Sequence, residues 1–84
     1  MGRKEKLTAR LLSNPRDMTF EEAEALLGYF GYSRFNKGKT SGSRVMFVCP
    51  NRPSILLHKP HPRKELLPYQ IRQLTDVLRQ EGLI

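Results

Sequence analysis

The fold is indicated most clearly by the segment Arg44-Val-Met-Phe-Val-Cys-Pro-Asn-Arg-Pro-Ser-Ile-Leu-Leu-His58. Residues 44–48 combine β-branched and aromatic side chains, which is typical of a strand. Strand alternation places Val45 and Phe47 on one face and Arg44, Met46 and Val48 on the other, so Phe47 is expected in the core. Two prolines within 49–53 predict a turn, and residues 54–58 predict a second strand. Two strands joined in this way predict an antiparallel hairpin.

Two helices are predicted before this hairpin. Residues 3–13 carry leucines at helical spacing, and Asn14-Pro15 ends the helix because a residue before proline avoids the α region. A second helix begins after Thr19, since Glu22 three residues later completes a capping box. Gly31 is placed to end it in the left-handed conformation.

A further strand and a last helix complete the order α-α-β-β-β-α. Residues 32–36 predict the strand, which a polar turn over 37–42 joins to the hairpin as an antiparallel meander. Pro68 suits the first turn of the last helix, and Gly82 suits its cap. This order predicts an α+β fold with helices on one face of a three-stranded antiparallel sheet and the opposite face open.

The chain's size and composition limit the function classes. Its 84 residues make one domain, 1–84, in which residues 1–16 form an N-terminal helical extension. A single cysteine, Cys49, excludes an intrachain disulfide and a multi-cysteine zinc site. No apolar run is long enough to span a membrane, and no signal-peptide core is present. We therefore expect a cytoplasmic domain that binds no metal or cofactor and does not associate with a membrane.

Basic residues are concentrated in the middle of the chain. The net charge is +7, yet residues 1–24 carry five basic and five acidic side chains. Between Glu24 and Glu65 there is no acidic residue, and the basic residues there are Arg34, Lys37, Lys39, Arg44, Arg52, Lys59, Arg63 and Lys64. A field of one sign attracts a polyanion such as RNA. The simpler interpretation is a solvated basic surface.

The loop Lys37-Gly-Lys-Thr-Ser-Gly-Ser43 has the composition of a phosphate-contacting segment. It contains the letters GKT but is no Walker loop, because Ser33 stands where the upstream glycine belongs. The candidate RNA-binding residues here are Lys37, Lys39, Ser41 and Ser43. A plain hairpin turn is the alternative.

Two histidines, His58 and His61, lie among Lys59, Arg63 and Lys64. Histidine suits proton transfer in RNA cleavage because its pKa lies near working pH, and the cations suit charge stabilisation and phosphate binding. A metal pair is disfavoured, since no carboxylate or thiol is close in sequence. A structural hydrogen bond is the alternative role for His58.

Aromatic residues offer a second kind of RNA contact. Tyr32, Phe35 and Phe47 are candidates to stack on bases, although the strand alternation favours a core position for Phe47.

The sequence resembles the HicA family, the toxins of HicBA-type toxin–antitoxin pairs, over about residues 19–84. The resemblance rests on Gly42-Ser43 before the strand, on His61 with Lys64-Glu65-Leu66, and on the ending Leu78 to Gly82-Leu83. It implies a double-stranded-RNA-binding-domain-like fold. It also implies a ribosome-independent mRNA interferase, an endoribonuclease, with a HicB-type antitoxin as its partner. With histidine for proton transfer and cations for charge stabilisation, we expect this cleavage to be metal-independent.

The family pattern places a catalytic histidine directly after Gly-Ser, where this chain has Arg44. Arginine stays protonated and cannot act as a general base, but it can bind phosphate and stabilise a developing oxyanion. The resemblance then assigns the acid–base role to His61, at the second histidine of the pattern, with His58 as the other candidate. The alternatives are an RNA-binding module that has lost cleavage, and a domain whose basic face docks an acidic protein.

Overall fold

The computed structural model describes residues 2–35 and 44–84. Its elements follow the predicted order: α1 (Arg3–Leu12), α2 (Phe20–Tyr29), β1 (Ser33–Phe35), β2 (Arg44–Cys49), β3 (Arg52–His58) and α3 (Pro68–Gln80). The strands form one sheet in the order β1-β2-β3, with both pairs antiparallel. The predicted α+β class is therefore confirmed. The predicted turn over 37–42 lies outside the described residues.

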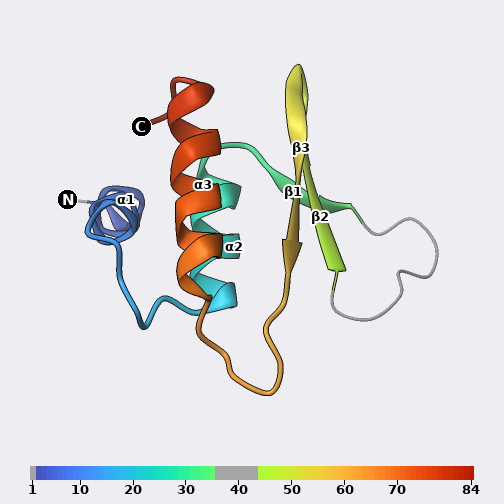
Figure 1. Ribbon diagram of the computed structural model, residues 1–84. Coiled ribbons are helices and arrows are strands. Elements are labelled where there is room, and N and C mark those ends of the chain that lie inside the picture. Colours follow the sequence, from blue (N-terminus) through green and yellow to red (C-terminus); the bar gives the residue numbers. More distant parts are fainter. Residues whose placement is uncertain (1, 36–43) are drawn as a thin grey trace.

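The chain forms three layers (Figure 1). Helices α2 and α3 cover one face of the sheet, and α1 packs against these two helices on their far side. The core between sheet and helices includes Phe47, Ile55 and Leu57 from the strands. Phe47 is 1% exposed and lies beside the ring of Phe20, which confirms the predicted strand alternation.

Helix α2 begins and ends as the sequence predicts. The backbone N–H of Glu22 donates to the Thr19 hydroxyl, and the Glu22 carboxylate accepts from the Thr19 backbone N–H, so the capping box is complete. Gly31 takes a φ of 96°, and the N–H of Tyr32 donates to the Leu27 carbonyl, which closes a Schellman motif.

Helix α1 is part of the folded domain. Leu7 and Leu11 are buried against the core, whereas Leu12 is exposed. The Arg10 guanidinium pairs with Glu22 of α2 and with Asp17 in the connection between the helices. Burial alone raises the pKa of Glu22, but the hydrogen bond from Thr19 and the charge of Arg10 outweigh burial and lower that pKa.

The β2–β3 hairpin differs from the prediction in one respect. The turn was predicted over residues 49–53, but Cys49 pairs with Arg52, so β3 begins at Arg52 and only Pro50-Asn51 remain in the turn. Asn51 has a φ of 65°, a conformation that asparagine tolerates in tight turns. Pro53 is accommodated because β3 is an edge strand.

An irregularity in this hairpin sets which residues of β2 and β3 lie opposite each other. The register shifts between Phe47 and Cys49. Continued without this shift, the pairing of Cys49 with Arg52 would place Arg44 opposite Leu57. With the shift, Arg44 is opposite His58. The shift therefore sets the partner of Arg44 across the hairpin, while the alternation of β2 about the buried Phe47 places Arg44 on the open face.

Within the described part of the chain, no helix is long and apolar enough to cross a membrane.

Candidate nucleic-acid interface

Arg44 and His58 lie directly opposite each other where β2 begins and β3 ends. Both residues are exposed. The carbonyls of Leu56 and His58 accept hydrogen bonds from α3 and thus point away from β2. The Arg44–His58 pair is therefore of the non-hydrogen-bonded type, in which the facing side chains approach most closely. A permanent cation and a titratable imidazole consequently share one end of the open sheet face.

The buried side chain of Gln70 fixes the backbone at His58. Its Nε2 donates to the His58 carbonyl at 2.7 Å, and its Oε1 accepts from the Leu67 backbone N–H at 2.9 Å. One amide thus joins the end of β3 to the start of α3. No motif in the sequence singles out Gln70. The available signal was its position one turn before Leu74 on the apolar side of α3.

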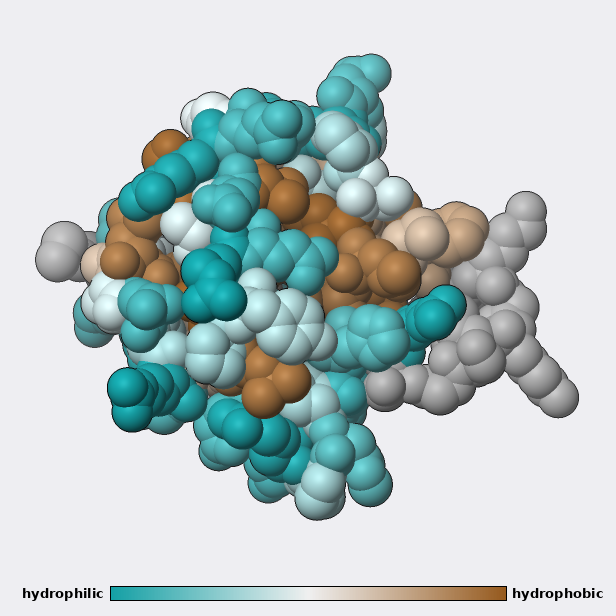
Figure 2. All heavy atoms as spheres, in the orientation of Figure 1, coloured by the Kyte–Doolittle hydropathy of each residue, from teal (hydrophilic) through white to brown (hydrophobic). Residues whose placement is uncertain are grey.

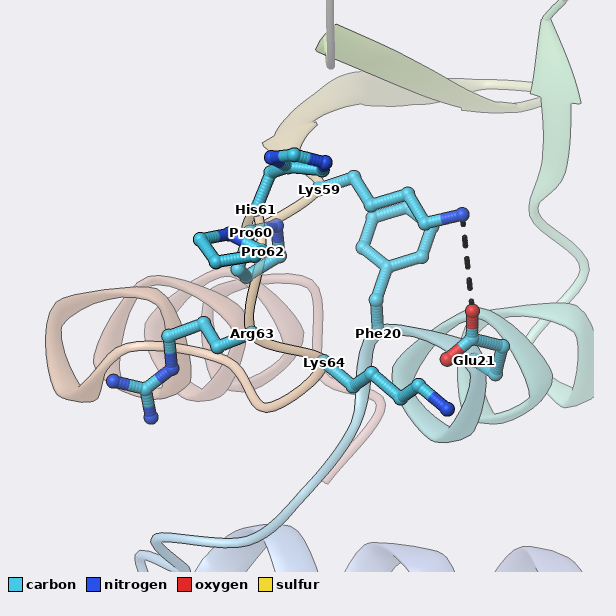
Figure 3. A pocket seen from close by; sticks show the side chains of 8 residues that line it. All are labelled: Phe20, Glu21, Lys59, Pro60, His61, Pro62, Arg63 and Lys64. Atoms are coloured by element: carbon cyan, nitrogen blue, oxygen red, sulfur yellow. Dashed lines mark ion pairs between the residues drawn. The ribbon is translucent and has the colours of Figure 1, made fainter.

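The segment that follows His58 lines a shallow pocket of about 160 Å³ with Phe20 and Glu21 of α2 (Figure 3). Lys59 extends along the Phe20 ring, with Nζ 5.9 Å from the ring centroid and 3.9 Å from the Glu21 carboxylate. His61 also lines this pocket. The Arg63 side chain points away from the Lys59–Glu21 pair, and its Nε donates to the Glu65 carbonyl.

Three of the central cations are balanced by carboxylates from the flanking segments. The ion pairs are Arg34–Glu24 at 2.6 Å, Arg52–Glu81 at 3.1 Å and Lys59–Glu21 at 3.9 Å. Among the residues that the structure describes, Arg44, Arg63 and Lys64 form no ion pair. The surface around the central segment is therefore less positive than a charge count along the sequence implies. Among the described residues of this segment, the cations whose charge is not paired are Arg44, Arg63 and Lys64.

The predicted site residues fall into three groups. Arg44 and His58 are brought together, and His61, Lys59, Arg63 and Lys64 follow His58 in the adjoining segment. The predicted phosphate contacts Lys37, Lys39, Ser41 and Ser43 lie outside the described residues. Across residues 2–35 and 44–84, no three His, Cys, Asp or Glu side chains gather as a metal site would need.

Of the three aromatic candidates for base stacking, Tyr32 is wrong, and Phe47 takes the core position that strand alternation favours. Tyr32 is 4% exposed and Phe47 is 1% exposed, so neither ring can face a ligand. Burial raises the pKa of the Tyr32 hydroxyl, which has no hydrogen-bond partner within the described residues. Phe35 is 43% exposed and remains available.

These features define a small α-β-β-β-α domain, extended by one N-terminal helix, whose sheet has one open face with a basic end. The chain belongs to the HicA family: the family model described as HicA toxin of bacterial toxin–antitoxin matches residues 20–83. Neither the curated proteins nor the solved structures gave a match. HicA proteins are toxins of toxin–antitoxin pairs and are known as mRNA interferases, so membership implies an RNA target and an antitoxin partner in general. Helix α1 lies outside the matched residues.

Proposed function

We propose that this protein is an RNA-directed toxin that cleaves mRNA without a metal, using the end of the sheet where Arg44 faces His58. The observation that carries the proposal is the register of β2 and β3, which pairs a permanent cation with an imidazole on an exposed surface.

The reaction is an attack of a ribose 2′-hydroxyl on the adjacent phosphate. A base removes the 2′-hydroxyl proton, the 2′-oxygen bonds to phosphorus, and the bond to the 5′-oxygen breaks as an acid protonates it. The products are a 2′,3′-cyclic phosphate and a 5′-hydroxyl. Arg44 binds the phosphate and stabilises the charge that develops on its oxygens. His58 and His61 carry the two proton transfers.

The structure favours His58 over His61 as the base. His58 is the cross-strand partner of Arg44, whereas His61 lies three residues further along, in the segment that lines the Phe20 pocket. The resemblance to the family pattern pointed first to His61, so both residues are tested.

A second candidate function is RNA binding without cleavage. The presence of Arg44 where the family pattern has a histidine favours it, because arginine cannot act as a base at physiological pH. The same surface would then bind mRNA, and the bound protein would obstruct its translation without cutting it.

Purified protein is incubated with a long mixed-sequence RNA in EDTA, beside Arg44→Ala, His58→Ala and His61→Ala. Arg72→Ala, which removes a cation from the α1 side of α3, is the matched control. We expect cleavage to fall at least about a hundredfold in Arg44→Ala and His58→Ala, to fall as well in His61→Ala, and to persist in Arg72→Ala.

Equal cleavage by all four variants would contradict the proposed site and indicate a contaminating nuclease. Intact RNA that is only retarded on a gel would support the binding module. In that case, cleavage gained by Arg44→His would identify the missing base.

A further inference from the structure

The open face of the sheet presents a row of apolar side chains. Phe35 pairs with Met46, and Met46 pairs with Leu56, so these residues lie side by side across all three strands. Phe35 and Leu56 are each 43% exposed, and Met46 is partly exposed. With strands about 4.8 Å apart, the row is roughly 10 Å long.

No described element packs against this row. Helices α2 and α3 cover the other face of the sheet, and α1 lies behind those helices (Figure 1). Figure 2 shows hydrophobic side chains at the surface over the strands, on the side away from the helices. An aromatic side chain and two flexible apolar side chains, paired in register and at least partly exposed, make a surface that a ligand can cover.

The charges around the row indicate what that ligand is. Arg44 precedes Met46 by two residues on β2, and His58 follows Leu56 by two residues on β3, so both lie on the same face at the same end. None of the three strands contains an acidic residue. A cationic end beside an uncharged apolar row suits a ligand with an anionic backbone and flat apolar faces.

We propose that the row Phe35–Met46–Leu56 is a stacking platform for an unpaired base of single-stranded RNA whose phosphate is held at Arg44. This proposal rests on the proposed RNA-directed function and adds the substrate class. Phe35 stacks on the base, while Met46 and Leu56 extend the flat apolar surface beneath it. About 7 Å along the strand separates Arg44 from Met46, which leaves room for a ribose between phosphate and base.

The platform selects single strands over duplexes. In a duplex, each base is stacked between its neighbours and cannot offer a face to a flat sheet. The protein would therefore act on unpaired regions of mRNA although its fold resembles that of duplex-binding domains.

The test measures binding of 2′-O-methyl oligonucleotides, which lack the attacking hydroxyl and stay intact. Three probes of one length are compared by fluorescence anisotropy: a single strand with bases, the same backbone without bases, and the duplex. The proteins are the wild type, Phe35→Leu, Phe35→Tyr and Arg44→Gln. Tyr69→Leu is the control for loss of an exposed aromatic ring outside the sheet.

We expect the base-bearing single strand to bind the wild type about tenfold more tightly than the baseless backbone or the duplex. Phe35→Leu should remove that advantage while leaving the baseless probe unaffected, and Phe35→Tyr should keep it. Tyr69→Leu should behave as the wild type. Arg44→Gln should weaken all three probes. Thermal melting of each variant separates unfolding from lost contact.

Equal affinity for the base-bearing and baseless strands would overturn the platform while leaving the RNA-directed function standing. So would unchanged RNA affinity in Phe35→Leu, which would reassign the row to a protein partner. Absence of binding by all three probes to the wild type would overturn the proposed function itself.

Discussion

The side-chain amide of Gln70, which is only 1% exposed, donates to the carbonyl oxygen of His58 at 2.7 Å. The same amide accepts from the Leu67 N–H, so a single side chain satisfies two backbone groups that would otherwise lie unpaired. It thereby holds the end of β3 against the start of α3, next to the proposed RNA site.

Replacing Gln70 with alanine should destabilise the domain by about 1–3 kcal/mol, because a buried side chain is lost and two partly buried backbone groups lose their hydrogen-bond partner. The free energy of unfolding is measured by urea denaturation. Gln73→Ala is the matched control, since Gln73 is less buried and makes one bond, at 3.0 Å, to the Leu56 carbonyl. The control should lose less than about 1 kcal/mol. Equal losses of unfolding free energy in the two variants would show that the two hydrogen bonds of Gln70 stabilise the domain no more than the single bond of Gln73.

Ion pairing within the fold predicts which cations contribute to the salt dependence of RNA binding. Each phosphate neutralised on a single strand contributes a slope of about −0.7 in log K against log salt. Lys64→Gln should make the slope less steep by about 0.7. Arg34→Gln should change it little, because Arg34 already pairs with Glu24 at 2.6 Å. Affinities are measured at four or more salt concentrations. Equal changes of slope in both variants would contradict the inference that cations paired within the fold contribute little to RNA binding.

The lowered pKa of Glu22 predicts a pH-dependent contribution to stability. The carboxylate is favoured in the folded state, so its contribution is present above the ordinary value of about 4.3 and is lost as pH falls through the lowered folded value. Glu22→Gln keeps an oxygen that can accept from Thr19 but removes the charge that faces Arg10. At pH 7 it should cost about 1 kcal/mol or less, since the pair is partly exposed.

As pH falls from about 4.3 through the lowered folded value, the melting temperatures of wild type and Glu22→Gln should converge, because the wild-type carboxyl becomes neutral as well. Thermal melting between pH 3 and pH 7 follows the difference. A constant difference across this range would show that the Arg10–Glu22 charge interaction does not stabilise the fold.

Local signals in the sequence predicted much of the fold. The Thr19–Glu22 capping box and the left-handed Gly31 were predictable because each depends on residues within a few positions of one another. The hairpin turn was predicted too long, because Asn51 and the edge position of β3 allow Arg52 and Pro53 to join the strand.

The site was less predictable because it depends on pairing between distant segments. The placement of Arg44 opposite His58 depends on a one-residue shift in the β2–β3 register, for which the sequence offers no local signal. The partners of Arg34 and Arg52 come from α2 and from the end of the chain, so a charge count along the sequence overstated the basic surface. Tyr32 was a stacking candidate by residue type, yet the fold buries it.

The most direct test of the central claim is a titration of the ¹⁵N-labelled protein with an uncleavable single-stranded 2′-O-methyl RNA, followed by amide chemical shifts. We expect the largest shifts at Arg44, at His58 and in the 59–64 segment, while amides of α1 such as Thr8 and Ala9 stay unchanged. Shifts concentrated on α1 and the outer side of α3, with Arg44 and His58 unaffected, would contradict that claim.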